Sequence, residues 1–355
     1  MASSAYRRLG AGTAAGAVFV ALAACGPQAG AGDPDDSDTA DADDGSTLTL
    51  YSGRAEELVG GIVPYLEDTT GHSVQVRYGD GAELAAQLAG EGAGTEADLF
   101  LAESAGTLGA LRANGVLREL PEHVLTVAPE RFRASDGSWV ATSARKRAIA
   151  YHPGRVDEED LPDTTEELVD EQWAGEVGYA PADASWQTFV SGLRRLEGDN
   201  GAREWLTDFA GNDPEAFADN ASVLDAVDNG EVALGLVNHD DHRMRTVERG
   251  AAGVAAELHH PAAGDALALV DVAGVGVVRS SDAPEAASEA ARFLMSGTAQ
   301  QYFADAAAEY PMRANVTSTR HDLQDVEELD GPNIDLSELS APDETRKLLN
   351  EVGLT

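Results

Sequence analysis

A run of five polar residues follows an apolar stretch in the second half of the chain. Residues 232–237 have the length and composition of a buried strand, and the chain continues Asn238-His239-Asp240-Asp241-His242. Ligands of open α/β sheets bind at the carboxyl ends of strands, which is where these side chains would lie. The run therefore predicts one wall of a ligand site, and a solvated loop of a very acidic protein is the competing interpretation.

Carboxylates are the candidate metal ligands. Asp240 and Asp241 are hard oxygen donors, suited to Mg, Ca, Mn or ferric iron. Neighbouring residues of an extended chain point to opposite faces, so both reach one ion only if the backbone turns there. Glu103 directly follows a third apolar segment and is either a further ligand or a neighbour of a helix N-cap. The candidate metal ligands are thus Glu103, Asp240 and Asp241.

Cations and helix starts offer a seat for an anion. Arg54 follows the first predicted strand, and Arg145 begins a run of three cations, Arg145-Lys146-Arg147. That run predicts an anion contact or a crossing between lobes, with a local salt-bridge face as the alternative. A helix begins near Ser185, capped by Asp183 or Ser185, and its free N–H groups could hold an anion.

The elements that must position these residues alternate as strand and helix. Apolar spacing predicts strands at 47–51, 72–78 and 97–102, with helices at 56–66, at 82–89 and from 105. This order predicts an α/β fold with a parallel sheet flanked by helices. An extended segment at 139–151, a strand at 231–237 and strands within 264–279 continue the pattern, the last returning to the first lobe.

Composition limits the possible partners. The chain has 355 residues, 24 Lys and Arg, 63 Asp and Glu, and a formal charge of -39. Nucleic acid and anionic lipid are poor partners for such a surface. A length of this kind is enough for two lobes, and one cysteine excludes an internal disulfide.

The N-terminus has the pattern of an export signal. Arg7 and Arg8 precede a short apolar run that ends Leu22-Ala23-Ala24-Cys25. This ending resembles a bacterial lipoprotein box, which implies lipidation of Cys25 after cleavage. Residues 26–46 are rich in Gly, Ala, Asp, Ser and Thr, and predict a disordered acidic tether.

Residues 47–355 resemble the periplasmic ferric-ion-binding proteins of iron ABC importers, which have the two-lobed type II periplasmic-binding fold. The resemblance rests on seven segments in the same order and spacing: Tyr51-Ser-Gly-Arg-Ala-Glu-Glu57, Ala97-Asp-Leu-Phe-Leu-Ala-Glu103, Gly178-Tyr-Ala-Pro181, Asn229-Gly-Glu-Val-Ala-Leu-Gly-Leu-Val-Asn-His239, Val272-Ala-Gly-Val-Gly-Val277, Ala299-Gln-Gln-Tyr-Phe303 and Glu309-Tyr-Pro-Met312. It implies two lobes, each a mostly parallel sheet with helices, joined by crossover strands.

The chain departs from the family at the iron ligands. The family's tyrosine pair is replaced by Asp240-Asp241, and the place of a ligating histidine is Ala55. The acidic ligand remains as Glu103. Family members seat a small anion beside the iron, and the matching positions here are Ser185, Asn220 and Asn238, joined by Arg54 or Arg145.

We therefore expect a lipid-anchored solute-binding protein on the outer face of the cytoplasmic membrane, monomeric, feeding an ABC transporter permease and not an enzyme. Its expected ligand is Fe(3+) or a ferric complex with a synergistic anion. Three alternatives stay open: another metal or an anionic, phosphorylated organic solute; a secreted carboxylate- or metal-dependent enzyme; and an envelope protein that binds nothing small. The expected parts are a signal peptide at 1–25, a tether at 26–46, lobe 1 at 47–144 plus 265–310, and lobe 2 at 145–264 plus 311–355.

Overall fold

The computed structural model describes residues 46–339 and 342–355. The export signal, Cys25 and nearly all of the predicted tether lie outside the described residues. Within the described residues, no helix combines the length and the apolar character needed to cross a bilayer.

The folded chain opens with three repeats of strand and helix, as its apolar spacing predicts. These are β1 (Thr47–Ser52), α1 (Glu56–Thr70), β2 (Ser73–Tyr78), α2 (Gly81–Glu91), β3 (Leu99–Ala102) and α3 (Ala105–Ala113). Val59, Ile62 and Leu66 recur at helical spacing and bury one face of α1, while Glu56 and Glu57 favour the positive end of its dipole. β1 pairs in parallel with both β2 and β3.

A short helix, α4 (Glu122–Leu125), follows and still belongs to the first group. The middle of the chain then builds a second group of elements that begins with a long strand. It comprises β4 (Val140–Tyr151), α5 (Thr165–Leu168), β5 (Val177–Tyr179), α6 (Ala184–Gly211), β6 (Glu215–Ala216), α7 (Asn220–Asp228), β7 (Leu234–Asn238), α8 (His239–Arg249) and β8 (Glu257–His259). The chain ends with β9 (Val270–Val277), α9 (Pro284–Leu294), α10 (Gly297–Ala307), β10 (Tyr310–Pro311) and α11 (Pro342–Val352). β5 is parallel to both β6 and β7.

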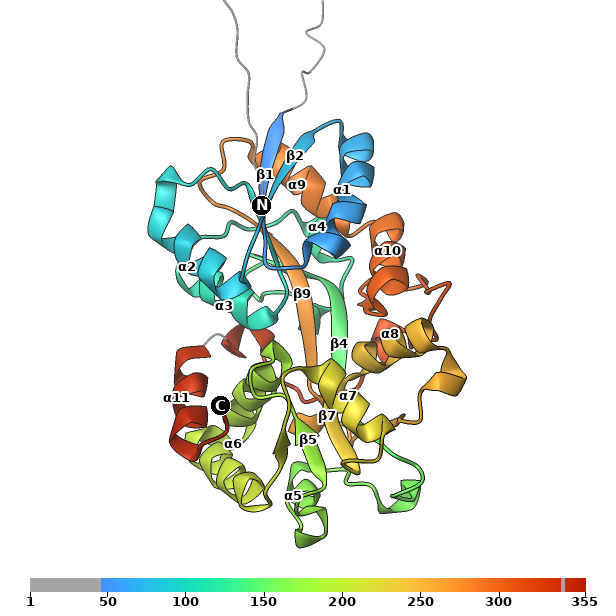
Figure 1. The fold of residues 1–355 in the computed structure, drawn as a ribbon. Helices are drawn as coiled ribbons and strands as arrows, with labels where there is room; N and C mark the ends of the chain where they lie inside the picture. Colours follow the sequence, from blue (N-terminus) through green and yellow to red (C-terminus); the bar gives the residue numbers. More distant parts are fainter. Residues whose placement is uncertain (1–45, 340–341) are drawn as a thin grey trace, which may run out of the picture. The chain divides into compact units, whose positions relative to one another are not determined.

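One hydrogen-bonded path of strands joins the two groups, in the order β2-β1-β3-β9-β4-β7-β5-β6, with β8 and β10 also paired to β4. The two long strands β4 and β9 run through the middle of this arrangement (Figure 1). Residues 140–146 of β4 pair with β9, and residues 147–151 pair with β7. The expected α/β fold, parallel at both ends and joined by crossover strands, is confirmed.

Apolar side chains gather in separate cores on the two sides of this crossing. The first core contains β1, β3, α1 and α9, and the second contains Trp186, Phe189 and Phe209 of α6. The segment after β10 differs from the expected division at residue 310. Val326, Leu329 and Leu339 pack in the first core, with residues 336–339 lying against α3, while Leu348 and Leu349 of α11 pack in the second core.

The helix start at His239 is the feature that spacing alone did not predict. The sequence predicted a strand ending at Val237 followed by polar chain, but β7 runs to Asn238 and α8 begins at once. Asn238 is the N-cap of α8, so Asp240 and Asp241 lie in a first helical turn rather than on extended chain. The backbone turn that two adjacent carboxylates need is therefore present.

Candidate functional site

A cavity of about 510 Å³ brings the predicted site residues together. It is lined by all of the candidate metal and anion ligands: Arg54, Glu103, Arg145, Ser185, Asn220, Asn238, Asp240 and Asp241. Apart from Arg145, which lies within β4, they come from loops and element ends of both cores, after β1 and β3 on one side and at the starts of α6, α7 and α8 on the other. Strand carboxyl ends and helix amino ends thus face one space, as the fold class predicts.

The start of α6 forms a polar wall of this cavity. Asp183 is the N-cap of α6, and its Oδ1 accepts hydrogen bonds from Ser185 N at 2.8 Å and Ser185 Oγ at 2.6 Å. The same hydroxyl oxygen accepts from Asn220 Nδ2 at 3.2 Å. Ser185 is therefore oriented by its neighbours, with the N-terminal N–H groups of α6 beside it.

Arg147 is a charged neighbour of this wall that we did not assign to the site from sequence. Its Nη1 donates to Ser185 Oγ at 3.1 Å, its guanidinium lies 5.5 Å from the ring centre of Phe189, and its Nη2 is buried without a hydrogen-bond partner. Burial lowers the pKa of Arg147 to about 10, although Asp183 and Asp241 act in the opposite sense. The signal was present in the sequence, because Arg145 and Arg147 lie two residues apart and share one face of a strand.

Asp241 is held by the backbone that it helps to cap. Its Oδ2 accepts from Asn238 N at 3.0 Å and from Asn220 Nδ2 at 3.0 Å, and it forms a capping box with Asn238. Burial raises the pKa of Asp241 to about 6, against the lowering effect of the Asn238 hydrogen bond. One oxygen of Asp241 is thus committed to structure, although the residue lines the cavity.

Asp240 is the acidic residue of the cavity with the least internal support. Its side chain is 16% exposed, and its Oδ1 has no hydrogen-bond partner. His239 Nδ1 lies 3.5 Å from that oxygen, but it already accepts from Lys146 N at 3.1 Å, so it has no proton to donate. Burial, together with the negative charge of Asp241, raises the pKa of Asp240 well above its usual range. A cation in the cavity would favour the ionised carboxylate and so counteract both causes of the raised pKa of Asp240.

Arg54 is tied into a buried ion pair at the other side of the cavity. Its Nη2 lies 2.5 Å from Glu309 Oε1, and its Nη1 donates to Ser143 Oγ at 3.1 Å. Ser143 in turn donates to Glu309. Burial raises the pKa of Glu309, but the charges of Arg54 and Arg145 outweigh that effect and lower it overall. Arg54 is thus neutralised by Glu309, a partner that the sequence did not identify as a site residue.

Arg145 links the third strand of the first core to the crossover strands. Its Nη1 lies 3.1 Å from Glu103 Oε1, its Nη2 donates to Glu103 O at 2.6 Å, and Asp271 Oδ2 lies 3.6 Å from its Nη2. Burial lowers the pKa of Arg145, but Glu103, Glu309 and Asp271 raise it above its usual range. The Glu103 carboxylate is 48% exposed and follows β3 immediately before the α3 N-cap, Ser104.

The carboxylates do not converge on one point. Among residues 46–339 and 342–355, no three His, Cys, Asp or Glu side chains are placed to hold a metal ion together. Glu103 is engaged by Arg145 and Asp241 by the α8 start, so Asp240 is the carboxylate of the three that has a buried oxygen without a partner. A metal would need either movement of these groups or oxygen atoms supplied by a bound anion.

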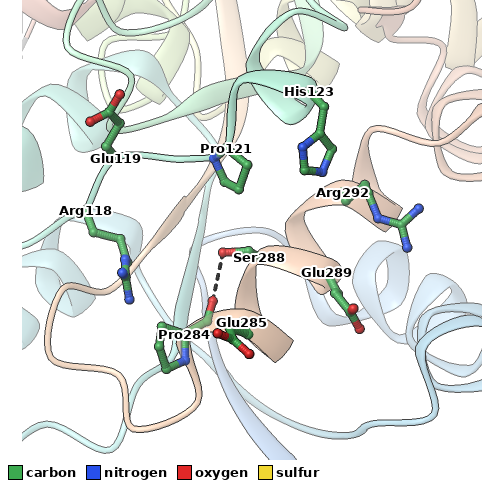
Figure 2. A pocket seen from close by; sticks show the side chains of 9 residues that line it. All are labelled: Arg118, Glu119, Pro121, His123, Pro284, Glu285, Ser288, Glu289 and Arg292. Atoms are coloured by element: carbon green, nitrogen blue, oxygen red, sulfur yellow. Dashed lines mark hydrogen bonds between the residues drawn. The ribbon is translucent and has the colours of Figure 1, made fainter.

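A second hollow of about 420 Å³ differs in kind from this cavity. Figure 2 shows Arg118 and Arg292 lining it together with Glu119, Glu285 and Glu289, and Ser288 donating to Pro284 O at 2.7 Å. Its acidic side chains are exposed and its charges are of both signs. Such a lining favours no ligand of one charge, so the first cavity remains the candidate site.

Comparison with known proteins gives one family and a consistent set of relatives. Residues 95–330 match the family model of the bacterial extracellular solute-binding proteins. The chain is 28% identical over 311 residues to the major ferric iron-binding protein of Neisseria meningitidis serogroup B, covering 86% of this chain and 93% of that protein. It is 30% identical over 276 residues to iron uptake protein A1 of a Synechocystis species, covering 76% of each.

A solved structure agrees with the sequence matches. The iron-bound HitA of Pseudomonas aeruginosa superimposes with a TM-score of 0.78 at 31% identity, covering 87% of this chain and 99% of that one. The similarity therefore extends over both cores and the strands that join them.

Proposed function

We propose a cargo for this protein on one premise: the chain belongs to the bacterial extracellular solute-binding protein family, among the periplasmic ferric-iron-binding proteins. Proteins of this group bind and transport solutes and are not enzymes. The proposed cargo is ferric iron, taken together with an anion that supplies part of its coordination. Citrate and phosphate are anions of the required kind, because each offers several anionic oxygens.

One observation carries this proposal. Asp240 Oδ1 is a buried acceptor without a partner, Arg145 Nε is a buried donor without a partner, and both residues line the cavity. Unsatisfied buried polar atoms are uncommon and point to a missing ligand. An acceptor suits a cation, and a donor suits an anion, so a metal–anion pair satisfies both.

The coordination differs from that of a tyrosinate site. No tyrosine lines the cavity in the described part of the chain, and the positions of the family's phenolates hold Asp240 and Asp241. We propose Asp240 as the first protein ligand to iron, with Asp241 and Glu103 joining when the cavity is occupied. The anion is then held by Arg145, Ser185, Asn220 and Asn238. Arg54 contributes positive charge next to these residues.

The test is a titration of the full chain with ferric citrate, followed by calorimetry and visible absorbance. We expect saturable binding that weakens at least tenfold in Asp240→Asn, with no phenolate charge-transfer band. A wild-type complex that turns red-purple would refute carboxylate coordination. No heat with ferric citrate, ferric phosphate or ferric carbonate would refute iron as the cargo.

An anionic organic solute is the second candidate, because Arg147 and the α6 start favour an anion even without a metal. Citrate or a sugar phosphate would then bind equally well with and without iron, and Asp240→Asn would strengthen that binding by removing a like charge. The same calorimetric series separates the two candidates.

We also propose that the protein is anchored through lipidated Cys25 and delivers its cargo to an ABC transporter permease. The support is the Leu22-Ala23-Ala24-Cys25 box and the family's role in solute transport. Cys25→Ala should move the protein from the membrane fraction to the medium or leave it uncleaved. Unchanged membrane retention of the Cys25→Ala protein would refute the anchor.

A further inference from the structure

Lys146 lies on the face of β4 that the cavity does not use. Side chains of a strand alternate between faces, and its neighbours Arg145 and Arg147 point to Glu103 and Ser185 in the cavity wall. Lys146 therefore points to the opposite side, which we call the rear face of β4. It is only 6% exposed.

Other elements bring polar side chains to the same rear face. Tyr310 pairs with Ala144, two residues before Lys146, so it shares that face. On the other edge of β4, Ile149 pairs with His259, which places His260 opposite Ala148 and on the Lys146 side. Helix α8 packs against β4 (Figure 1). Its Arg243 follows His239 by one helical turn, and the His239 ring stacks on Tyr310 with 4.1 Å between ring centres.

Strand pairing and the first turns of α8 place these groups on one face of β4, and their charges act on one another. Desolvation and the charges of Lys146 and Arg243 together lower the pKa of His260 to about 4, although the residue as a whole is exposed. Burial also lowers the pKa of Lys146, against the effect of Asp330. Arg243 acts on His239, His242 and Tyr310 as well. Lys146, Arg243 and His260, which we call the rear patch, thus form one electropositive group.

Lys146 lacks the side-chain hydrogen bonds that the other buried cations of the described residues, Arg54, Arg147 and Arg245, make. Within the described residues, neither the Lys146 ammonium nor the Arg243 guanidinium forms a hydrogen bond or an ion pair, and Asp330 acts on Lys146 only through its field. Carboxylates are abundant, with 63 Asp and Glu against 24 Lys and Arg, so an unpaired and nearly buried lysine needs another explanation. A buried charge is normally paired or neutralised.

We propose that the rear patch binds one small oxyanion of the phosphate or sulfate type. An ammonium, a guanidinium and a neutral imidazole N–H supply donors of three different directions, which suits the several oxygens of such an anion. The three side chains come from β4, from α8 and from the segment after β8, so the anion joins these elements on the side away from the cavity. This site is independent of the proposed cargo and of the residues that would hold it.

The lysine content allows a direct test. The chain has two lysines, Lys146 and Lys347, and Lys347 is exposed on α11. In full-length protein labelled with ¹³C at the lysine ε-carbon, NMR resolves one buried and one exposed signal. Titration with inorganic phosphate or sulfate should move the Lys146 signal saturably and raise the titration midpoint of Lys146, because a nearby anion favours the ammonium form. The Lys347 signal should follow ionic strength only, as it does in sodium chloride.

Two variants locate the anion. Arg243→Gln should weaken the Lys146 response at least fivefold without changing the midpoint of chemical denaturation, and His260→Gln should weaken it to a smaller extent. Arg147→Met, which alters the cavity face of the same strand, should leave the response unchanged. A Lys146 signal that moves no more in phosphate or sulfate than in sodium chloride would overturn the site. Loss of the response in Arg147→Met with retention in Arg243→Gln would overturn it too, because the anion would then lie in the cavity.

Discussion

His239 Nδ1 accepts a hydrogen bond from the backbone N–H of Lys146, with 3.1 Å between the two nitrogen atoms. Along this edge of β4, Ala144 pairs with β10 and Arg147 pairs with β7, so the amide of Lys146 falls in the gap between two strands. The imidazole fills that gap, donates from Nε2 to Ala308 O at 2.9 Å and stacks on Tyr310. The ring thus completes the sheet where neither strand reaches.

Replacing His239 should therefore destabilise the protein although the residue adjoins a binding cavity. We expect His239→Ala to lower the free energy of unfolding by about 2 to 4 kcal/mol, from an unpaired buried amide and the lost ring stack. Chemical denaturation measures this directly. His123→Ala, at an exposed position, is the matched control and should change stability by less than about 0.5 kcal/mol. Equal effects of the two changes would contradict the structural role.

The same ring predicts how stability depends on pH. Burial lowers the pKa of His239 to about 3 from an ordinary value of 6.5. Between these values the unfolded chain binds a proton that the folded chain does not, so this contribution to stability is complete above pH 6.5 and is lost as the pH falls. The stability difference between wild type and His239→Phe should rise with pH by about 1.4 kcal/mol per unit in this window. Urea denaturation at pH 4.5, 5.5 and 6.5 measures it, and a difference that does not change with pH would contradict the assignment.

Asp241 should show the opposite dependence. Burial raises the pKa of Asp241 to about 6, so between pH 3.8 and 6 the folded chain binds the extra proton. Its contribution to stability therefore falls as the pH rises through that window, and Asp241→Asn should remove this term. The difference between wild type and Asp241→Asn should slope downward with rising pH where the His239 difference slopes upward. Slopes of the same sign would show that one of the two pKa directions is wrong.

Replacing Arg147 should change ligand affinity much more than it changes the free energy of unfolding. The side chain is buried with one hydrogen bond and one unpaired nitrogen, so the free protein gains little from its charge. We expect Arg147→Met to leave the free energy of unfolding within about 1 kcal/mol of wild type, or to raise it, while the affinity for ferric citrate falls at least tenfold. Denaturation and calorimetry on the same preparations test both parts. A large loss of stability without loss of affinity would make Arg147 a structural residue.

Breaking the Arg54–Glu309 pair, in contrast, should lower the free energy of unfolding strongly. Both side chains are at most 4% exposed, and each charge depends on the other. Glu309→Gln should cost about 3 to 5 kcal/mol because it leaves Arg54 buried without its counter-ion, and adding Arg54→Met should recover much of that loss. The exposed Glu103 offers a contrast, since Glu103→Gln should cost less than about 1 kcal/mol. Additive effects in the Arg54–Glu309 double-mutant cycle would contradict the coupling.

Local sequence patterns predict most of what positions the cavity. Arg54, Glu103 and Asn238 could be predicted as site residues because each follows or ends a buried apolar run. In a parallel sheet such residues lie at the carboxyl ends of the strands, where ligands bind. The same logic left open whether the backbone turns after Val237, since the Asn238–Asp241 capping box sets a helix start that apolar spacing does not record.

Long-range partners were beyond such reasoning. Glu309 meets Arg54 across 255 positions of sequence, and nothing near either residue indicates the other. The packing of residues 326–339 on the first core was missed for a similar reason, because Val326 and Leu339 carry no periodic pattern and owe their burial to elements distant in sequence. Arg147 was accessible in principle from its two-residue spacing to Arg145, but its burial is a tertiary property.

The passage of the chain between the two cores through β4 and β9 has a consequence for limited proteolysis. Both crossings are hydrogen-bonded strands: β4 pairs with β9 up to Lys146 and with β7 from Arg147 onward. A protease needs a stretch of chain that can leave its surroundings, and neither crossing offers one. Limited digestion should trim the ends of the folded chain and its exposed loops, yet it should never release one core from the other. Even a nick engineered at the crossing would leave two fragments that copurify until the whole sheet unfolds.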